Sequence, residues 1–207
     1  MGMPRPSRVW DAMLRGNERF VSGDPEHPRQ DVERRETVAG GQAPHAVLFG
    51  CSDSRLAAEI IFDKGIGDLF VVRNAGQVVS ESVIGSIEYA VAILHVPLLI
   101  VLGHDECGAV RAAIDAEEPD AAPLPPHIHS LVEQIIPAVR EVRASAGPGR
   151  PDAGEVGRLH LRNTITELLE GSEVISEAVA AGTLAIVGAN YRLAEGRAVR
   201  DTVVGTV

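Results

Sequence analysis

Two cysteines and one histidine are the residues of this chain best suited to chemistry. Cys51 opens the stretch CSDSR, and Cys107 stands three residues after His104 in HDECG. Two sulfurs and one imidazole form a ligand set that zinc accepts in tetrahedral geometry. Three protein ligands leave a fourth position free, which distinguishes a catalytic zinc site from a closed structural one.

Other interpretations of the two cysteines remain open from the residues alone. A cysteine can be a buried core residue, half of a disulfide, a redox group or a nucleophile, and a lone H-x-x-C pair is a weak motif. A secreted protein could join Cys51 to Cys107, whereas a reducing compartment favours a reactive or metal-binding role. Asp53 and Arg55, directly after Cys51, favour the metal site.

The spacing of Asp53 and Arg55 suggests what they do beside a metal. A carboxylate can accept the hydrogen of a zinc-bound hydroxide and so orient its lone pair toward a substrate. Asp53 can do this only while it is ionised and held off the metal. The permanently charged guanidinium of Arg55 can grip that carboxylate through two hydrogen bonds.

Four apolar runs predict the strands that must position these groups. The runs lack polar alternation, as expected for a sheet that is covered on both faces. Helical patterns between them predict right-handed crossovers and a mostly parallel sheet. The predicted strands are 46–50, 69–74, 97–104 and 183–190, and the helical patterns include 56–63, 82–94 and a long last helix over 155–181.

The ends of the chain complete an α/β fold. The N-terminal part predicts two helical arms, 7–23 and 31–40, and YRLAEGRAVRDT after the fourth strand predicts a turn into a short edge strand. The predicted fold is thus a central sheet of four mostly parallel strands plus a short edge strand, flanked by helices. We expect one domain over residues 1–207, with the arm at about 7–40 and the core at about 44–200. Two stretches rich in Pro, Gly and Ala, 117–127 and 145–154, predict surface connections.

Polar residues gather where the predicted strands end. Cys51 follows the first strand, Arg73 and Asn74 end the second, and His104 ends the third. Functional groups in open α/β sheets collect beyond the carboxyl ends of the strands. We therefore expect the site at this edge, with Arg73 and Asn74 holding loops and a subunit contact rather than touching substrate.

Composition narrows the class of protein. The chain has 207 residues, of which 45% are hydrophobic, and a formal charge of −10. This charge argues against a nucleic-acid partner. No apolar run is long enough to span a bilayer, and the start of the chain carries no apolar signal segment. We expect a cytoplasmic protein without a membrane partner.

At this point the sequence resembles a known family, the β-class carbonic anhydrases. The resemblance rests on CSDSR (51–55) and HDECG (104–108), and it extends to GQAP (41–44), LFVVRNAG (69–76) and GSIEYAV (85–91). It covers about residues 17–200, although no motif within 115–160 can be matched. Two motifs at the right separation are far more specific than either one alone.

The resemblance implies roles for individual residues. One Zn²⁺ per subunit would be held by Cys51, His104 and Cys107, with Asp53 and Arg55 as the catalytic pair. Asp53 could also bind the metal in a closed form of the site that is favoured at lower pH. The residues that the resemblance assigns to binding CO₂ or bicarbonate are Gln42, Phe70, Ala75, Tyr89 and Gly108.

The implied activity is the zinc-dependent, reversible hydration of CO₂ to bicarbonate and a proton by attack of zinc-bound hydroxide. Three alternatives stay open: the same site acting on carbonyl sulfide or carbon disulfide, a non-catalytic zinc protein, and a thiol redox enzyme. The resemblance also implies a homodimer, or a tetramer of stacked dimers, in which Gln42 reaches the substrate across the subunit boundary. Both N-terminal arms would then lie on the partner rather than on their own core.

Overall fold

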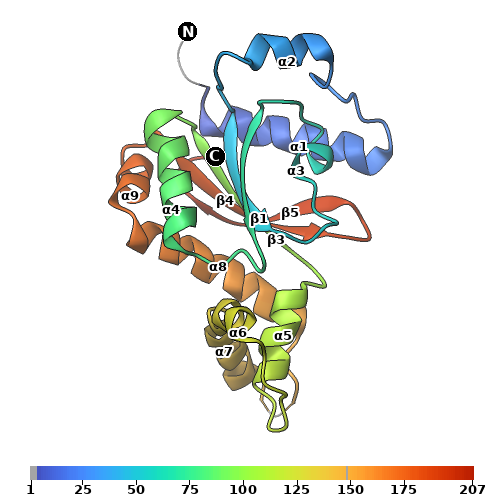
Figure 1. The fold of residues 1–207 in the computed structure, drawn as a ribbon, viewed down its shortest axis with the longest axis vertical. Coiled ribbons are helices and arrows are strands. Elements are labelled where there is room, and N and C mark those ends of the chain that lie inside the picture. The colour runs from blue at the N-terminus through green and yellow to red at the C-terminus, as the bar shows by residue number, and fades with distance from the viewer. Residues whose placement is uncertain (1–3, 148) are drawn as a thin grey trace.

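The computed structural model describes residues 4–147 and 149–207, and in this part of the chain five strands form one sheet (Figure 1). The strand order is β2-β1-β3-β4-β5, with the first four strands parallel and the last antiparallel to its neighbour. The strands are β1 (Ala46–Cys51), β2 (Leu69–Asn74), β3 (Leu98–His104), β4 (Ala185–Arg192) and β5 (Arg197–Val204).

The central strands are buried on both faces. In β1, Leu48 belongs to one hydrophobic core and Phe49 to the other, and Ile100 and Val101 divide in the same way in β3. Every residue of these two strands is buried. This double burial is the reason why the strands appear in the sequence as continuous apolar runs.

Helices cover both faces of the sheet. They are α1 (Pro6–Ser22), α2 (Val32–Val38), α3 (Ala58–Ile61), α4 (Glu81–Glu88), the π-helix η1 (Tyr89–Ile93), α5 (Gly108–Ala116), α6 (Pro126–Glu133), α7 (Ile136–Ala146), α8 (Ala153–Gly171) and α9 (Glu173–Ala180). Figure 1 shows α4 and α9 on one side of the sheet and α1 and α3 on the other. Among the described residues, no helix is both long enough and apolar enough to cross a bilayer.

The predicted α/β fold is confirmed, with three differences in its elements. The edge strand β5 is as long as β4, eight residues each, rather than short. The helix predicted over 82–94 is α4 followed by the wider turns of η1. The helix predicted over 155–181 breaks at Ser172, whose extended backbone ends α8 and whose side chain caps α9 by accepting from the N–H of Ile175.

The resemblance implied that both N-terminal helices lie on a partner rather than on their own core, and for α1 the absence of packing on its own core is wrong. Trp10 and Met13 are buried in the chain's own core. The side chain of Asn17 donates to the carbonyls of Ile61 and Gly196, at 3.1 and 2.8 Å. These contacts fasten α1 to its own sheet, whereas none of the residues of α2 is buried.

Helices α5, α6 and α7 form a lobe below the carboxyl ends of the parallel strands (Figure 1). The stretch 117–125 lies between α5 and α6 outside regular helix, which agrees with the predicted connection over 117–127. Residue 148, in the connection predicted over 145–154, and residues 1–3 lie outside the described residues. The site lies where this lobe meets the sheet, because α5 starts directly after the HDEC motif.

Candidate active site

The first two candidate ligands end neighbouring strands. Cys51 is the last residue of β1 and His104 the last of β3, and the two strands pair in parallel. The chain leaves β1 for β2 on one side and later enters β3 on the other, so the strand order reverses between β1 and β3. Ligand sites of open α/β sheets lie beyond the carboxyl ends at such a reversal.

Cys107 joins these two residues from the N-terminus of a helix, where it is the N-cap of α5. One ligand atom from each of Cys51, His104 and Cys107 lies within 4.8 Å of the others, and all three residues are buried. Both cysteines are free, so they do not form a disulfide. The three donors can converge on one ion at the bond lengths of about 2.0–2.3 Å that zinc prefers.

The histidine is oriented for metal binding. Its Nδ1 lies 2.7 Å from the backbone carbonyl of Asp105. Because a carbonyl oxygen only accepts, this bond places the proton on Nδ1 and leaves the lone pair on Nε2. In the described part of the chain, Nε2 of His104 is buried and has no hydrogen-bond partner. An orphaned acceptor is costly, so the residues present fit an ion at this point.

The turn between the histidine and the second cysteine is held in a particular shape. Glu106 has a left-handed backbone, with φ at 52°, which a non-glycine residue rarely adopts. The carboxylate of Asp105 accepts from the backbone N–H of Leu193 at 2.9 Å and ties the turn to the end of β4. The sequence interpretation gave Asp105 no role; its place directly after a metal-binding histidine was the available signal.

The surroundings of Cys51 favour its thiolate. Hydrogen bonding with Cys107 is the largest influence and lowers the pKa of the Cys51 thiol; burial opposes it, and His104 adds to the lowering. The backbone N–H of Gly76 also donates to the sulfur, at 3.3 Å. The hydrogen bond with Cys51 raises the pKa of Cys107, and burial and the repulsion between two adjacent thiolates raise it further. A divalent cation between the sulfurs relieves that repulsion.

Asp53 and Arg55 form a bidentate ion pair beside the sulfurs. Nε and Nη2 of Arg55 lie 2.9 and 2.7 Å from the two carboxylate oxygens, and the backbone N–H of Arg55 donates to Oδ1 at 2.9 Å. The side-chain hydrogen bonds from Arg55 hold the pKa of Asp53 well below its usual range. Asp53 is therefore ionised at neutral pH, and it is not one of the three clustered donors.

Arg73 and Asn74 act on the loops around the site, as predicted. The guanidinium of Arg73 donates to the carbonyls of Cys51 and Asp53, at 2.9 and 2.7 Å, and so fixes the loop that carries both functional side chains. The side-chain amide of Asn74 closes the next turn by donating to the carbonyl and accepting from the N–H of Val78.

The five residues assigned to substrate binding fall into two groups, of which the first lies at the site. Ala75 directly precedes Gly76, whose N–H contacts the Cys51 sulfur. Gly108 directly follows Cys107 as the first residue of α5, and a side chain placed there would meet open space. Both residues are exposed, so their backbone is accessible beside the sulfurs.

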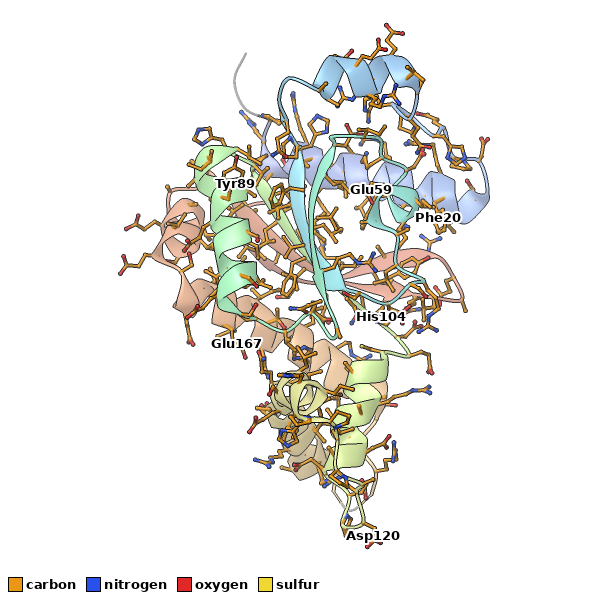
Figure 2. The ribbon with its side chains drawn as sticks, viewed as in Figure 1. Phe20, Glu59, Tyr89, His104, Asp120 and Glu167 are labelled. Carbon is orange, nitrogen blue, oxygen red and sulfur yellow. The ribbon has the colours of Figure 1, made fainter. Side chains whose placement is uncertain are left out.

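The second group lies toward the other end of the sheet. Phe70 pairs with Val47 near the start of β1, and its ring centroid is 6.2 Å from that of Tyr89. Gln42 precedes β1 and is exposed. Figure 2 shows Tyr89 in the upper part of the fold and His104 lower down, near the place where the lobe begins. The structure therefore does not bring Gln42, Phe70 and Tyr89 to the sulfurs of their own chain.

Comparisons with known proteins agree with this geometry. A family model described as carbonic anhydrase matches residues 46–198. Carbonic anhydrase 2 of Mycobacterium tuberculosis H37Rv is 50% identical over 202 residues, which cover 98% of this chain and 96% of the relative. The carbonic anhydrase of Mycolicibacterium smegmatis is 48% identical, covering 93% of this chain and 91% of the relative.

Solved structures share the fold. A β-carbonic anhydrase of Aspergillus fumigatus superposes with a TM-score of 0.74 at 26% identity, covering 93% of this chain and 90% of that chain. A tetrameric β-carbonic anhydrase of Sordaria macrospora superposes with a TM-score of 0.72 at 24% identity, covering 93% and 96%. Together with the cluster of Cys51, His104 and Cys107, these matches show that the chain belongs to the β-class carbonic anhydrases, zinc enzymes that interconvert CO₂ and bicarbonate.

Proposed function

We propose that each active site of this carbonic anhydrase is built from two copies of the chain. One copy supplies the three zinc ligands together with the pair of Asp53 and Arg55. The other copy supplies the cleft wall that receives CO₂ and bicarbonate, through Gln42, Phe70 and Tyr89. The minimum functional assembly is then a homodimer.

The observation that carries this proposal is the length of β1. Cys51 ends the strand, whereas Gln42 precedes it and Phe70 pairs with its second residue. A strand rises about 3.3 Å per residue, so the six residues of β1 span roughly 16–20 Å. A side chain cannot bridge this distance, and Gln42 and the 45% exposed Tyr89 are open to a second molecule.

Within the zinc half of the site, the chain's own residues orient the reaction. When bound, zinc would lower the pKa of a water molecule at the site. Two thiolate ligands should make it a weaker Lewis acid than three histidines do. Asp53, held ionised, accepts the hydrogen of the nucleophilic oxygen and turns a lone pair of that oxygen toward CO₂. Arg55 restrains both oxygens of Asp53 and keeps the carboxylate away from the metal position.

A mixing experiment tests the composite site. Gln42→Ala damages only the cleft half, and Asp53→Asn damages only the zinc half. If the halves come from different copies, a heterodimer of these two variants contains one site with both halves intact. Co-expression with two different tags and purification by both isolates that heterodimer, and we expect about half of the wild-type CO₂ hydration rate from its one intact site of two.

The controls separate the composite site from a site within one chain. Each parent homodimer should be strongly impaired in stopped-flow CO₂ hydration, with its zinc content unchanged. A heterodimer no more active than the mean of its parents would show that Gln42 serves the site of its own chain, or none. Light scattering on the same samples must show a dimer or a larger assembly.

Two further features belong to the same proposal. A tetramer made of two such dimers is compatible with the Sordaria relative, which is described as tetrameric. Both sulfurs must also stay reduced to bind zinc, which favours a reducing compartment such as the cytoplasm.

A further inference from the structure

A buried histidine outside the zinc ligands contacts the site through one glycine. His160 lies in α8 and is 3% exposed. Its Nε2 lies 2.8 Å from the backbone carbonyl of Gly76. Since the carbonyl can only accept, Nε2 carries the proton. Burial lowers the pKa of His160 and so favours this neutral, Nε2-protonated ring.

Gly76 is the residue whose N–H contacts the zinc-binding sulfur of Cys51, at 3.3 Å. It has a left-handed backbone, with φ at 81°, and a Cβ there would come within 2.9 Å of Cβ of Ala109. Only glycine can occupy this position without strain. The conformational freedom of glycine also means that its dihedrals need an external contact to stay fixed.

Two side chains of α8 contact this turn, and one of them, His160, reaches Gly76 itself. The side chain of Asn74 hydrogen-bonds to the backbone of Val78 and so joins the two ends of the turn, but it does not contact Gly76 in the middle. At the middle, the side chain of His160 contacts the Gly76 carbonyl, whereas the hydroxyl of Thr164 contacts the next carbonyl, that of Gln77, at 3.4 Å. A continuous path of hydrogen bonds thus runs from α8 through Gly76 to the sulfur of Cys51.

We propose that His160 is a positioning residue for the zinc thiolate of Cys51, which acts by holding Gly76 so that its N–H stays on the sulfur. An N–H···S hydrogen bond withdraws electron density from a thiolate, and outer contacts of this kind tune the metal that the ligand binds. With two thiolates on the zinc, weaker donation from one of them leaves the metal a stronger Lewis acid. The proposal rests on the zinc ligand set and not on the composite cleft.

Two amide variants form a matched pair for the test. The amide nitrogen of His160→Gln can take the place of Nε2, whereas the shorter His160→Asn side chain cannot reach the Gly76 carbonyl. Cobalt(II) in place of zinc gives a sulfur-to-metal charge-transfer band that reports electron donation from the thiolates. We expect wild type and His160→Gln to share the band position, and His160→Asn to show it at lower energy.

Activity provides the second readout. The kcat for CO₂ hydration by the zinc enzyme should fall about 10-fold in His160→Asn and recover in His160→Gln, at unchanged zinc content. Thr164→Val removes a buried hydroxyl one turn later on α8, which donates to the carbonyl of His160 at 2.9 Å and lies 3.4 Å from the carbonyl of Gln77, the residue after Gly76. It should leave the cobalt band in place.

Three outcomes would overturn the proposal. The first is an unmoved band in His160→Asn, and the second is an equal shift in the Asn and Gln variants. The third is a shift in Thr164→Val as large as that in His160→Asn, because it would show only a general loosening of the loop. If His160→Asn fails to fold, His160→Gln alone decides. A cobalt band that differs from wild type in folded His160→Gln contradicts the proposal. A band at the wild-type position supports a hydrogen bond from the Gln amide to the Gly76 carbonyl.

Discussion

At the scale of single residues, the zinc site depends on backbone contacts as much as on its ligands. The carbonyl of Asp105 selects the tautomer of His104, and the guanidinium of Arg73 holds the carbonyls of Cys51 and Asp53. Such supports fix the direction from which each ligand approaches the metal. The geometry of the site should therefore be sensitive to residues that never touch zinc or substrate.

Arg73 provides a direct test of this sensitivity. We expect Arg73→Leu to lower kcat by about 10- to 100-fold while the zinc content stays at the wild-type value, because the loop that carries Asp53 loses two hydrogen bonds. Arg15→Leu, at an exposed position of α1, is the control and should keep full activity. Stopped-flow CO₂ hydration measures both, and wild-type kinetics in Arg73→Leu would refute the supporting role.

The motifs predict the ligands because few residue types bind zinc, and two cysteines and a histidine at this spacing indicate a metal site. They do not predict His160 or Asp105, because these residues act on or through carbonyl groups, which every residue has. Only the folded chain shows which carbonyl each of them contacts. The left-handed backbone of Glu106 could not be predicted either, because a non-glycine residue gives no sequence signal for this conformation.

At the scale of elements, the four parallel strands were predictable and the helix boundaries less so. A strand buried on both faces leaves an unbroken apolar run, whereas α8 and α9 share one amphipathic pattern that continues across their break. Gly171 and Ser172 were the available signal, since serine is a good N-cap. The full length of β5 was missed because only half of that edge strand's pattern is apolar.

The connection from α1 to α2 depends on one buried carboxylate. The side chain of Asp63 is 1% exposed and accepts from Nε of Arg19 at 2.6 Å and from the N–H groups of Glu26 and His27. Burial is the largest single influence and raises the pKa of Asp63, but the hydrogen bonds from Glu26, Arg19 and His27 together outweigh it and lower the pKa.

Asp63→Asn should therefore lower the free energy of unfolding by about 2 kcal/mol at pH 7. A carboxylate with a depressed pKa in the folded state stabilises the protein above its ordinary pKa and loses that effect as pH falls. The difference between wild type and variant should shrink below about pH 4. Urea unfolding at pH 7 and below about pH 4 measures this difference in the free energy of unfolding. Asp11→Asn, at an exposed position of α1, is the control. A difference that does not change with pH would contradict the role of the Asp63 carboxylate.

At the scale of the whole molecule, the pattern of apolar residues could not say which surface α1 covers. Its Trp10 and Met13 predict a buried face equally well for a helix on its own core or on a partner. The structure places the buried face of α1 on its own sheet, so that face is not available to a partner, whereas Tyr89 is exposed. That residues 1–207 fold as one domain stays a prediction.

Unfolding of the zinc-loaded protein tests the single domain. Zinc binds the folded chain at ligands that come from two strands and a helix, so its removal should lower the melting temperature of the whole molecule. We expect one calorimetric transition, shifted down by a chelator and restored by added zinc. Two separate transitions, of which only one responds to zinc, would contradict a single domain.

The most direct measurement of the central claim is the metal content of the purified protein, combined with X-ray absorption at the zinc edge. We predict one zinc per chain, bound by two sulfurs and by two lighter nitrogen or oxygen ligands, of which one is His104. Cys107→Ser should lose the metal or one of the sulfur contributions. If protein purified under reducing conditions contains no zinc, or if its zinc has no sulfur neighbours, the proposed ligand set is contradicted.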